Sequence, residues 1–339
     1  MNIGILGAGS LGTIMGAIVS QNGGSCVLID ANQEHVDALN TNGATITGLL
    51  DLNAPVRAIT PDQMSKPFDI VIVLLKQTAN KAALTKMLPF LKADSIVCCL
   101  QNGVPEEAVA EIIGMERTLG GSVSWGGAWI SPGVAQLTSE PSHMRIEIGS
   151  PDGGKEEQLA KVAAFLKLAG EVEINPNLMG VKWAKLLNNC ALSGMSAALG
   201  VTFGEIIDDD KGAACAVHIA NELLLIAAAK GIRLEVIVPG FDYYDFGFSD
   251  QAGRDRAIAI LRRLYEPHRA QTASMMNDMK RGIPCEIDFI NGIVCDNGKK
   301  IGINTPFNQQ VVDIVKRFEA KEIPFPTMAN LELFTVPEL

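Results

Sequence analysis

The residue types best suited to chemistry recur at four-residue intervals in the segment 181–196. Lys185, Asn189 and Ser193 place an ammonium, an amide and a hydroxyl among otherwise apolar neighbours. Because residues four apart share one face of an α-helix, a helix here would stack the three groups. The pattern favours one wall of a polar pocket that binds a small molecule. An ordinary amphipathic helix with a solvated stripe fits the same positions.

A glycine-rich motif near the N-terminus is suited to binding the phosphates of a dinucleotide. It follows a short β-rich run, opens a helical pattern, and consists of Gly7, Ala8, Gly9, Ser10, Leu11 and Gly12. In this context Gly7 permits a tight turn, Gly9 lets the backbone approach a pyrophosphate, and Gly12 lets the helix pack closely on the strand. The free N–H groups at the start of the helix would bind the anion. The motif therefore predicts a dinucleotide site.

Asp30 lies at the end of the second β-rich run, about 20 residues beyond the glycines, where a carboxylate accepts hydrogen bonds from the adenine-ribose 2′-hydroxyl. It is followed by Ala31, and no arginine is close in sequence. A carboxylate there would repel a 2′-phosphate, so the pattern favours NAD over NADP. An alternative role for Asp30 is to cap a helix that begins near Asn32.

Two further polar loops are expected at the same edge of the predicted sheet. Lys76 lies in the loop 75–78, after the run 70–74, and Asn102 lies in the loop 101–104, after the run 96–100. Ligands of open α/β sheets bind at the carboxyl ends of the strands. We therefore expect Lys76 to contact the phosphates or the nicotinamide ribose, and Asn102 to hydrogen-bond near the nicotinamide. Ordinary surface positions are the alternative for both.

The elements that must position these residues change in character along the chain. Up to about residue 175, β-rich runs alternate with helical patterns, which predicts a mostly parallel sheet covered on both faces. The expected strands are 3–6, 26–29, 70–74, 96–100 and 118–123, followed by an antiparallel edge formed by 134–138 and 144–148 and a last strand at 171–174. The later half predicts helices at 178–198, 212–230, 254–281, 286–300 and 308–321. We expect two domains, 1–176 and 177–339, with the active site where they meet.

Composition restricts the possible partners. The chain has 339 residues and a formal net charge of −10, with no basic run, which disfavours nucleic acid and anionic membranes as partners. Its 7 cysteines show no CxxC spacing and fit free thiols in a reducing cytoplasm. The longest apolar runs, such as 223–229, are shorter than the ~20 residues of a membrane span. We expect a cytoplasmic protein that binds small molecules, with no export signal and no metal site.

Over nearly its whole length, the chain resembles the ketopantoate reductases (2-dehydropantoate 2-reductases). The matching segments are GAGSLG, LLKQT, QNGV, SPGVAQ, KWAKLLNNCALSG, SMMNDMKRGIPCEIDFINGIV and GINTPFN. The resemblance implies an α/β Rossmann domain followed by an all-α domain of the 6-phosphogluconate dehydrogenase C-terminal type, for substrate binding and dimerisation. It implies reduction of 2-dehydropantoate to (R)-pantoate in pantothenate and coenzyme A biosynthesis, with NADPH as the usual cofactor, by a homodimer.

The resemblance also implies roles for individual residues. Lys185 matches the family's general acid. An ammonium near the ketone stabilises the charge that develops on oxygen and donates the proton. Asn189 matches a substrate-binding asparagine, and Lys76 and Asn102 match the family's loop lysine and asparagine. The substrate-binding serine and glutamate correspond to Ser274 and Glu286, although Glu286 also suits an acid at a helix N-terminus.

Two departures from the family pattern leave alternatives open. Many ketopantoate reductases carry an arginine where this chain has Asp30-Ala31, and a second asparagine where it has Ser193. The shorter Ser193 leaves room for a different or bulkier 2-oxo acid. A β-hydroxyacid dehydrogenase, which also uses a lysine and an asparagine four residues apart, is the nearest other enzyme. A non-catalytic dinucleotide sensor is the alternative of another class.

Overall fold

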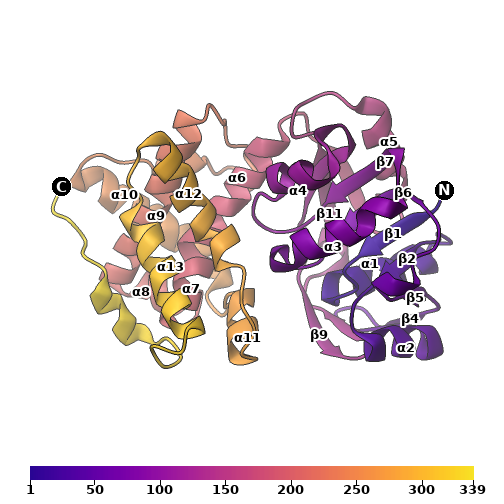
Figure 1. Ribbon diagram of the computed structural model, residues 1–339. Coiled ribbons are helices and arrows are strands. Elements are labelled where there is room, and N and C mark those ends of the chain that lie inside the picture. The colour runs from indigo at the N-terminus through magenta and orange to yellow at the C-terminus, as the bar shows by residue number, and fades with distance from the viewer. The chain divides into compact units, whose positions relative to one another are not determined.

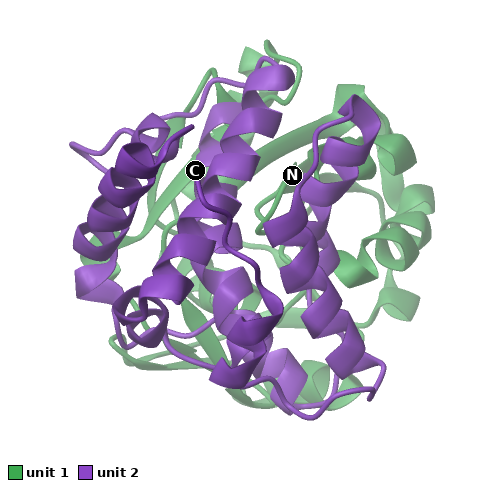
Figure 2. Cartoon of the chain, turned by 90° about the vertical axis from the view of Figure 1, so that its left-hand side faces the viewer, with its two compact units in different colours: residues 1–178 green, residues 179–339 purple.

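The N-terminal half forms the predicted sheet. The computed structural model describes residues 1–339, which divide into two compact units, residues 1–178 and 179–339 (Figure 2). Unit 1 holds an eight-stranded sheet of order β12-β11-β8-β7-β6-β1-β2-β5. Strands β11, β7, β6, β1, β2 and β5 of this sheet are labelled in Figure 1. Its strands are β1 (Ile3–Leu6), β2 (Val27–Ile29), β5 (Arg57–Ile59), β6 (Phe68–Val73), β7 (Leu91–Cys99), β8 (Thr118–Val123), β11 (Arg145–Gly149) and β12 (Glu171–Ile174).

The strand order explains why the predicted ligand loops lie at one edge. Strands β5, β2, β1, β6, β7 and β8 run parallel in that spatial order, whereas β11 is antiparallel to β8. This is the Rossmann arrangement, in which the winding reverses beside β1 and ligands bind outside the carboxyl ends of the strands. The loops after β1, β6 and β7 all lie at these ends. The predicted Rossmann fold with a mostly parallel sheet is confirmed.

Both faces of the sheet are covered, as expected. Successive residues of β6 alternate between two buried apolar clusters, with Ile70 and Ile72 in one and Val71 and Val73 in the other. The first cluster includes residues of α1 (Ser10–Gln21) and α5 (Glu156–Leu166), and the second includes residues of α3 (Asn80–Met87) and α4 (Glu106–Ile113). This burial on both sides accounts for the continuous hydrophobic runs in the central strands.

A second sheet was not predicted. It has the order β4-β3-β10-β9, with β3 (Ala44–Gly48), β4 (Leu52–Ala54), β9 (Gly127–Ser131) and β10 (Val134–Leu137). The run 134–138 was therefore wrongly assigned to the antiparallel edge of the main sheet, because β10 pairs in parallel with β3. Strand β11 does form an antiparallel pair with β8 in the main sheet, as expected for the run 144–148. Alternating side chains reveal a strand and its buried face but not its partner, which here lies far away in sequence.

Unit 2 is all-α, as predicted. Its helices are α6 (Leu178–Asn188), α7 (Met195–Leu199), α8 (Phe203–Asp208), α9 (Asp210–Ala229), α10 (Gln251–Tyr265), α11 (Ser274–Lys280), α12 (Asn291–Ile301) and α13 (Pro306–Glu319). By length and composition α9 could cross a membrane, but 78% of its apolar window is buried inside the protein. Burial of this kind is typical of the core helix of a helical domain.

Two predicted helices of unit 2 were too long. The helix expected over 254–281 ends at Tyr265, and Pro267 lies in the 3-10 turn η8 (Glu266–His268) that follows. Proline lacks the N–H that would continue the helix, and its ring clashes with the preceding turn. The helix expected from residue 286 begins only at Asn291, after the 3-10 turn η9 (Ile287–Phe289).

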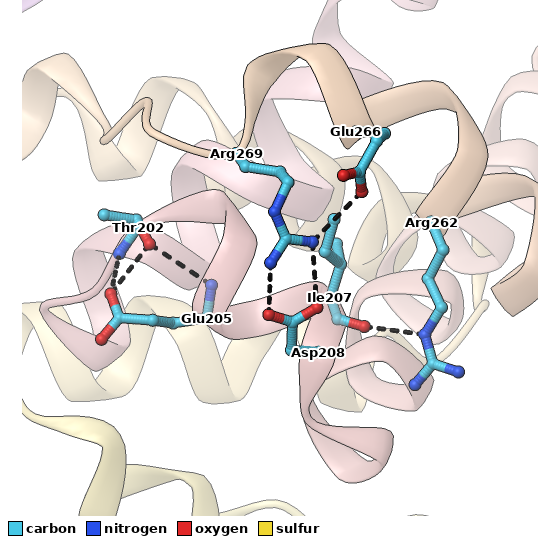
Figure 3. Close-up of polar contacts among 7 residues, drawn as sticks. All are labelled: Thr202, Glu205, Ile207, Asp208, Arg262, Glu266 and Arg269. Carbon is cyan, nitrogen blue, oxygen red and sulfur yellow. Dashed lines mark hydrogen bonds and ion pairs between the residues drawn. The ribbon is translucent and has the colours of Figure 1, made fainter.

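A capping box, an ion pair and a hydrogen bond to the main chain hold α8 in place (Figure 3). Glu205 N donates to Thr202 Oγ1 (3.3 Å), and Thr202 N donates to Glu205 Oε2 (2.8 Å), which forms a capping box at the start of the helix. Near its end, Arg269 donates to both carboxylate oxygens of Asp208 (3.0 and 2.5 Å). Arg262 donates to a main-chain carbonyl of α8 (2.7 Å). These contacts join α8 to α10 and to the residue that follows η8.

His218 on α9 makes the stability of the protein dependent on pH. Its imidazole is 7% exposed and stacks on Phe307, with ring centroids 4.3 Å apart. Burial, and secondarily the charge of Arg254, lower the pKa of His218 from 6.5 to about 4. Between these values the unfolded chain binds a proton that the folded chain does not. The contribution of His218 to the free energy of unfolding is thus complete above pH 6.5 and is lost as the pH falls through about 4. The total change is about 3 kcal/mol.

A His218→Phe variant tests this effect, because phenylalanine keeps an aromatic ring in the stack and cannot be protonated. We expect the free energy of unfolding of the variant, relative to wild type, to rise by up to about 3 kcal/mol between pH 7.5 and pH 4. Denaturant titrations across that range measure the difference. Parallel pH profiles for the two proteins would contradict the prediction.

Candidate functional site

The geometry of the glycine loop between β1 and α1 matches the three expected glycine roles. Gly7 has φ +99°, and an added Cβ would lie 2.4 Å from the backbone N of Leu75. A Cβ at Gly12 would lie 2.0 Å from the carbonyl oxygen of Gly7. A Cβ at Gly9 would meet nothing within 4 Å. The first and third glycines are therefore required by the protein's own packing, whereas the second borders open space.

That open space suits the pyrophosphate of a dinucleotide. Gly9 is the N-cap of α1, and no side chain caps the helix. The first N–H groups of a helix lack partners within the helix, and the helix dipole favours an anion near them. Open space over Gly9 next to an uncapped helix N-terminus is the geometry that a bound pyrophosphate needs. The residues of unit 1 thus fit a dinucleotide.

Asp30 is half-buried at the carboxyl end of β2, as the sequence predicted for a ribose-binding carboxylate. Its Oδ1 accepts a hydrogen bond from Asn32 N (3.0 Å). The side chain that caps α2 (Gln33–Asn42) is Asn32, whose Oδ1 accepts from His35 N (3.2 Å). The alternative role of Asp30 as the cap of this helix is therefore filled by another residue.

The loops that carry Lys76 and Asn102 are joined by buried amides. Both residues are exposed, and their neighbours Gln77 and Gln101 are buried. Gln77 Nε2 donates to the carbonyl oxygen of Asn102 (2.6 Å), and Gln101 Nε2 donates to that of Leu75 (2.6 Å). Sequence reasoning missed the two glutamines, although each stands directly beside a residue it had singled out. They fix both loops at the carboxyl edge of the sheet.

Lys185, Asn189 and Ser193, here called the polar ladder, do not lie along one regular α-helix. The sequence pattern predicted such a helix. Helix α6 ends at Asn188, and η6 (Asn189–Gly194) is π-helical before α7 resumes. A π-helix bonds i to i+5, so the four-residue spacing from Asn189 to Ser193 no longer gives one straight row. In this stretch the carbonyl oxygen of Cys190 accepts a hydrogen bond from Asn291 Nδ2 (3.2 Å). Such π segments occur frequently at functional sites.

The ladder residues are nevertheless among the few accessible residues of their segment. From residue 181 to 199, every residue is buried except Lys185, Asn188, Asn189 and Ser193, which are partly exposed. The Nδ2 atom of Asn189 is buried and has no hydrogen-bond partner. A buried donor left unpaired is costly, so this amide is suited to donate to an oxygen of a ligand.

The elements that carry Ser274 and Glu286 are hydrogen-bonded to the same segment. Ser196 Oγ on α7 accepts from Ala273 N (3.1 Å), which fixes the start of α11 and with it the exposed Ser274. Asn291, at the start of α12, is the donor to η6 described above. Glu286, which is 6% exposed, lies immediately before η9 and α12. The chain next to Ser274 and the start of the helix that follows Glu286 are thus both hydrogen-bonded to the segment that carries Asn189 and Ser193.

Two tyrosines that the sequence did not single out hold the junction of α6 and η6. Asn188 Nδ2 donates to the hydroxyl of Tyr243 (2.9 Å), and the hydroxyl of Tyr265 donates to Asn188 Oδ1. Burial raises the pKa of Tyr243 to about 12 and that of Tyr265 well above its usual value, so both remain neutral phenols. The only hint of these contacts in the sequence is the second asparagine, Asn188, beside Asn189. The tyrosines themselves come from segments far away in sequence.

A Rossmann unit with a dinucleotide-type glycine loop, followed by an all-α unit with an accessible lysine and amide, defines a class of two-unit oxidoreductases. Sequence comparison agrees: the profile described as ketopantoate reductase PanE/ApbA matches residues 3–153, and that of its C-terminal part matches residues 177–319. The chain belongs to the ketopantoate reductase family.

Individual relatives share the full length of the chain. The 2-dehydropantoate 2-reductase of Pyrococcus horikoshii is 30% identical over 322 residues, covering 94% of this chain and 98% of the relative. A structure of D-mandelate dehydrogenase with NADH and anilino(oxo)acetate is 25% identical with a TM-score of 0.81, and 95% of this chain and 99% of that chain are covered. A PanE/ApbA family ketopantoate reductase from Ralstonia eutropha JMP134 is 27% identical with a TM-score of 0.79 and the same coverage.

Proposed function

We propose that this protein is a nicotinamide-dependent reductase of 2-oxo acids, and that it converts 2-dehydropantoate to (R)-pantoate in pantothenate and coenzyme A biosynthesis. The observation that carries the proposal is the set of accessible polar groups in unit 2. Lys185, Asn189 and Ser193 are three of the four partly exposed residues in the segment 181–199. Residues close in sequence to Ser274 and Glu286 are hydrogen-bonded to the same segment. The name of the Pyrococcus horikoshii relative, a 2-dehydropantoate 2-reductase, supports the choice of substrate.

Lys185 is the proposed general acid. A bound reduced nicotinamide supplies the hydride that adds to the ketone carbon of the substrate. The negative charge that develops on the ketone oxygen is stabilised by the Lys185 ammonium, which then donates a proton to that oxygen. For this reaction, the ammonium and the nicotinamide must both reach the same carbonyl group.

The neighbouring polar groups suit the rest of the substrate. 2-Dehydropantoate carries a carboxylate, a ketone and a hydroxyl group. Asn189 Nδ2, which lacks a partner in the protein, is a donor for a carboxylate or ketone oxygen. Glu286 can accept from the substrate hydroxyl, and the hydroxyls of Ser193 and Ser274 can donate to the carboxylate.

On the cofactor side we propose that NADH is preferred over NADPH. The glycine loop with Lys76 and Asn102 would hold the pyrophosphate and nicotinamide ends. The Asp30 carboxylate would accept hydrogen bonds from the two hydroxyls of the adenine ribose. A 2′-phosphate at Asp30 would meet a like charge. The D-mandelate dehydrogenase that is similar to this chain was solved with NADH, which supports the same choice.

A second candidate substrate is a 2-oxo acid with a bulkier side chain. Ser193 replaces a longer asparagine of the family pattern, and the D-mandelate dehydrogenase structure contains anilino(oxo)acetate, an aryl-substituted 2-oxo acid derivative. A proposed homodimer, which the family resemblance implies, does not depend on the choice between the two substrates.

A steady-state comparison of NADH and NADPH with three carbonyl substrates tests the proposal. We expect kcat/KM to be highest for 2-dehydropantoate with NADH. Higher activity on phenylglyoxylate, the 2-oxo acid of mandelate, would select the second candidate. Preference for tartronate semialdehyde would point to a β-hydroxyacid dehydrogenase. Dinucleotide binding without turnover of any substrate would favour the sensor.

A further inference from the structure

His35, on α2, is 2% exposed and has both ring nitrogens in hydrogen bonds. Its Nδ1 lies 2.9 Å from the backbone N of Gly133, and its Nε2 lies 2.7 Å from the carbonyl oxygen of Ala8. Because the N–H of Gly133 can only donate, Nδ1 must be the acceptor. The ring proton then belongs on Nε2, which donates to Ala8. These two contacts require a neutral imidazole in a single tautomer.

The carbonyl oxygen of Ala8 belongs to the glycine loop and receives a second donor. Thr13 Oγ1, from the first turns of α1, donates to the same oxygen (2.7 Å). The Ala8–Gly9 peptide is trans, since the chain has no cis peptide bonds, so its C=O and N–H point in opposite directions. Fixing the oxygen of Ala8 on His35 and Thr13 therefore turns the N–H of Gly9 away from these two side chains. Space for a ligand exists at this glycine, because an added Cβ there would meet nothing within 4 Å.

The other ring nitrogen of His35 connects this loop to the second sheet. Gly133 lies in the turn between β9 and β10, within the SPGVAQ motif, and has φ +76°. Its carbonyl oxygen accepts from Thr45 N on β3 (2.9 Å), which fixes the turn within the second sheet. His35 is thus held between the glycine loop and a turn 98 residues away in sequence.

We propose that His35 is a positioning residue for the dinucleotide loop. It holds the Ala8–Gly9 peptide in the orientation that presents the N–H of Gly9 to the pyrophosphate. The second sheet, through Gly133, fixes the imidazole in the tautomer that this task needs. The inference rests on the dinucleotide site of the proposed function, and it gives the SPGVAQ motif a physical role.

Dinucleotide affinity of His35 variants tests the proposal. In His35→Leu both hydrogen bonds are lost, and the dissociation constant for NADH, or for NADPH if that is preferred, should rise about tenfold or more. His35→Gln retains one donor and one acceptor and should bind within about threefold of wild type. Thr13→Val removes the second donor to Ala8, together with the contact between Thr13 Oγ1 and His35 Nε2 (3.2 Å), and should weaken binding by about threefold.

A matched control separates positioning from stability. Asn40 lies on the same helix and makes two hydrogen bonds to the backbone of Ala58 (2.8 and 2.9 Å), away from the loop. Asn40→Leu should lower the melting temperature and leave the dissociation constant within twofold of wild type. Equal affinity of His35→Leu and wild type, or equal weakening by Asn40→Leu, would overturn the proposal.

Three further outcomes also have a defined meaning. If His35→Leu does not fold, the Thr13→Val variant decides, because an unchanged dissociation constant there contradicts the role of the Ala8 oxygen. If the wild-type protein binds neither dinucleotide, the proposed function itself fails, and with it the premise of the inference. If wild type binds and the His35 variants bind equally well, only the inference fails.

Discussion

Replacing Lys185 with methionine should lower kcat by about 10²- to 10⁴-fold, the usual contribution of a general acid, while dinucleotide affinity stays at the wild-type value. Methionine keeps an unbranched apolar side chain, so the loss comes from the ammonium rather than from packing. The ammonium is needed most in the transition state, when charge develops on the ketone oxygen. Steady-state kinetics and a separate dinucleotide titration measure the two quantities.

Two further variants sharpen this test. Lys185→Arg keeps a positive charge but is a poor acid, because a guanidinium does not deprotonate in proteins, so kcat should stay low while the KM for the 2-oxo acid recovers in part. Lys230→Met removes another lysine of unit 2, which donates to Asn297 Oδ1 (2.7 Å), and should leave kcat unchanged. Wild-type kcat in Lys185→Met would rule out the acid role.

Alanine at Gly9 should weaken dinucleotide binding and leave stability unchanged, whereas alanine at Gly12 should lower the stability of the fold. Gly9 has φ −61° in extended backbone, which other residues adopt, and a Cβ there meets nothing in the protein. Gly9→Ala should therefore unfold at the wild-type denaturant concentration. Its methyl group would occupy space needed by the pyrophosphate, and the dissociation constant should rise by about 10- to 100-fold, corresponding to the 1–3 kcal/mol that overpacking costs.

Gly12→Ala serves as the counterpart. Its Cβ would lie 2.0 Å from the carbonyl oxygen of Gly7, so α1 must move away from the loop. The free energy of unfolding should fall by about 1–3 kcal/mol. Equilibrium denaturation and dinucleotide titration of both variants distinguish the two effects. Tight dinucleotide binding by Gly9→Ala would show that no ligand approaches the backbone at this glycine.

The parts of the fold that were predictable are those fixed by local pattern. The glycine loop could be read from sequence because Gly7 and Gly12 satisfy steric demands of neighbouring residues. The β-rich runs of the main sheet are buried on both faces, which gives each strand a continuous apolar signal. The end of α10 was also available in the sequence, because Pro267 breaks the pattern that we extended to residue 281.

The features that were missed depend on partners far away in sequence. The π-helical stretch contains Cys190, whose carbonyl bonds to Asn291, 101 residues later. Periodicity gives the buried face of a helix but not a change in backbone hydrogen bonding that a distant side chain accompanies. Three other features could not be predicted from local patterns for the same reason. They are the contacts of Asn188 with Tyr243 and Tyr265, the contacts of Gln77 and Gln101, and the pairing of β3 with β10.

The proposed reaction can be tested directly by following the hydrogen that is transferred. Reduction of 2-dehydropantoate is run with reduced nicotinamide dinucleotide that carries deuterium at both C4 positions, and the product is examined by mass spectrometry and NMR. Hydride transfer to the ketone carbon should give pantoate with one deuterium at C2, formed at least about 100-fold more slowly by Lys185→Met. Pantoate without deuterium, or a wild-type enzyme that binds the dinucleotide and reduces no 2-oxo acid, would contradict it.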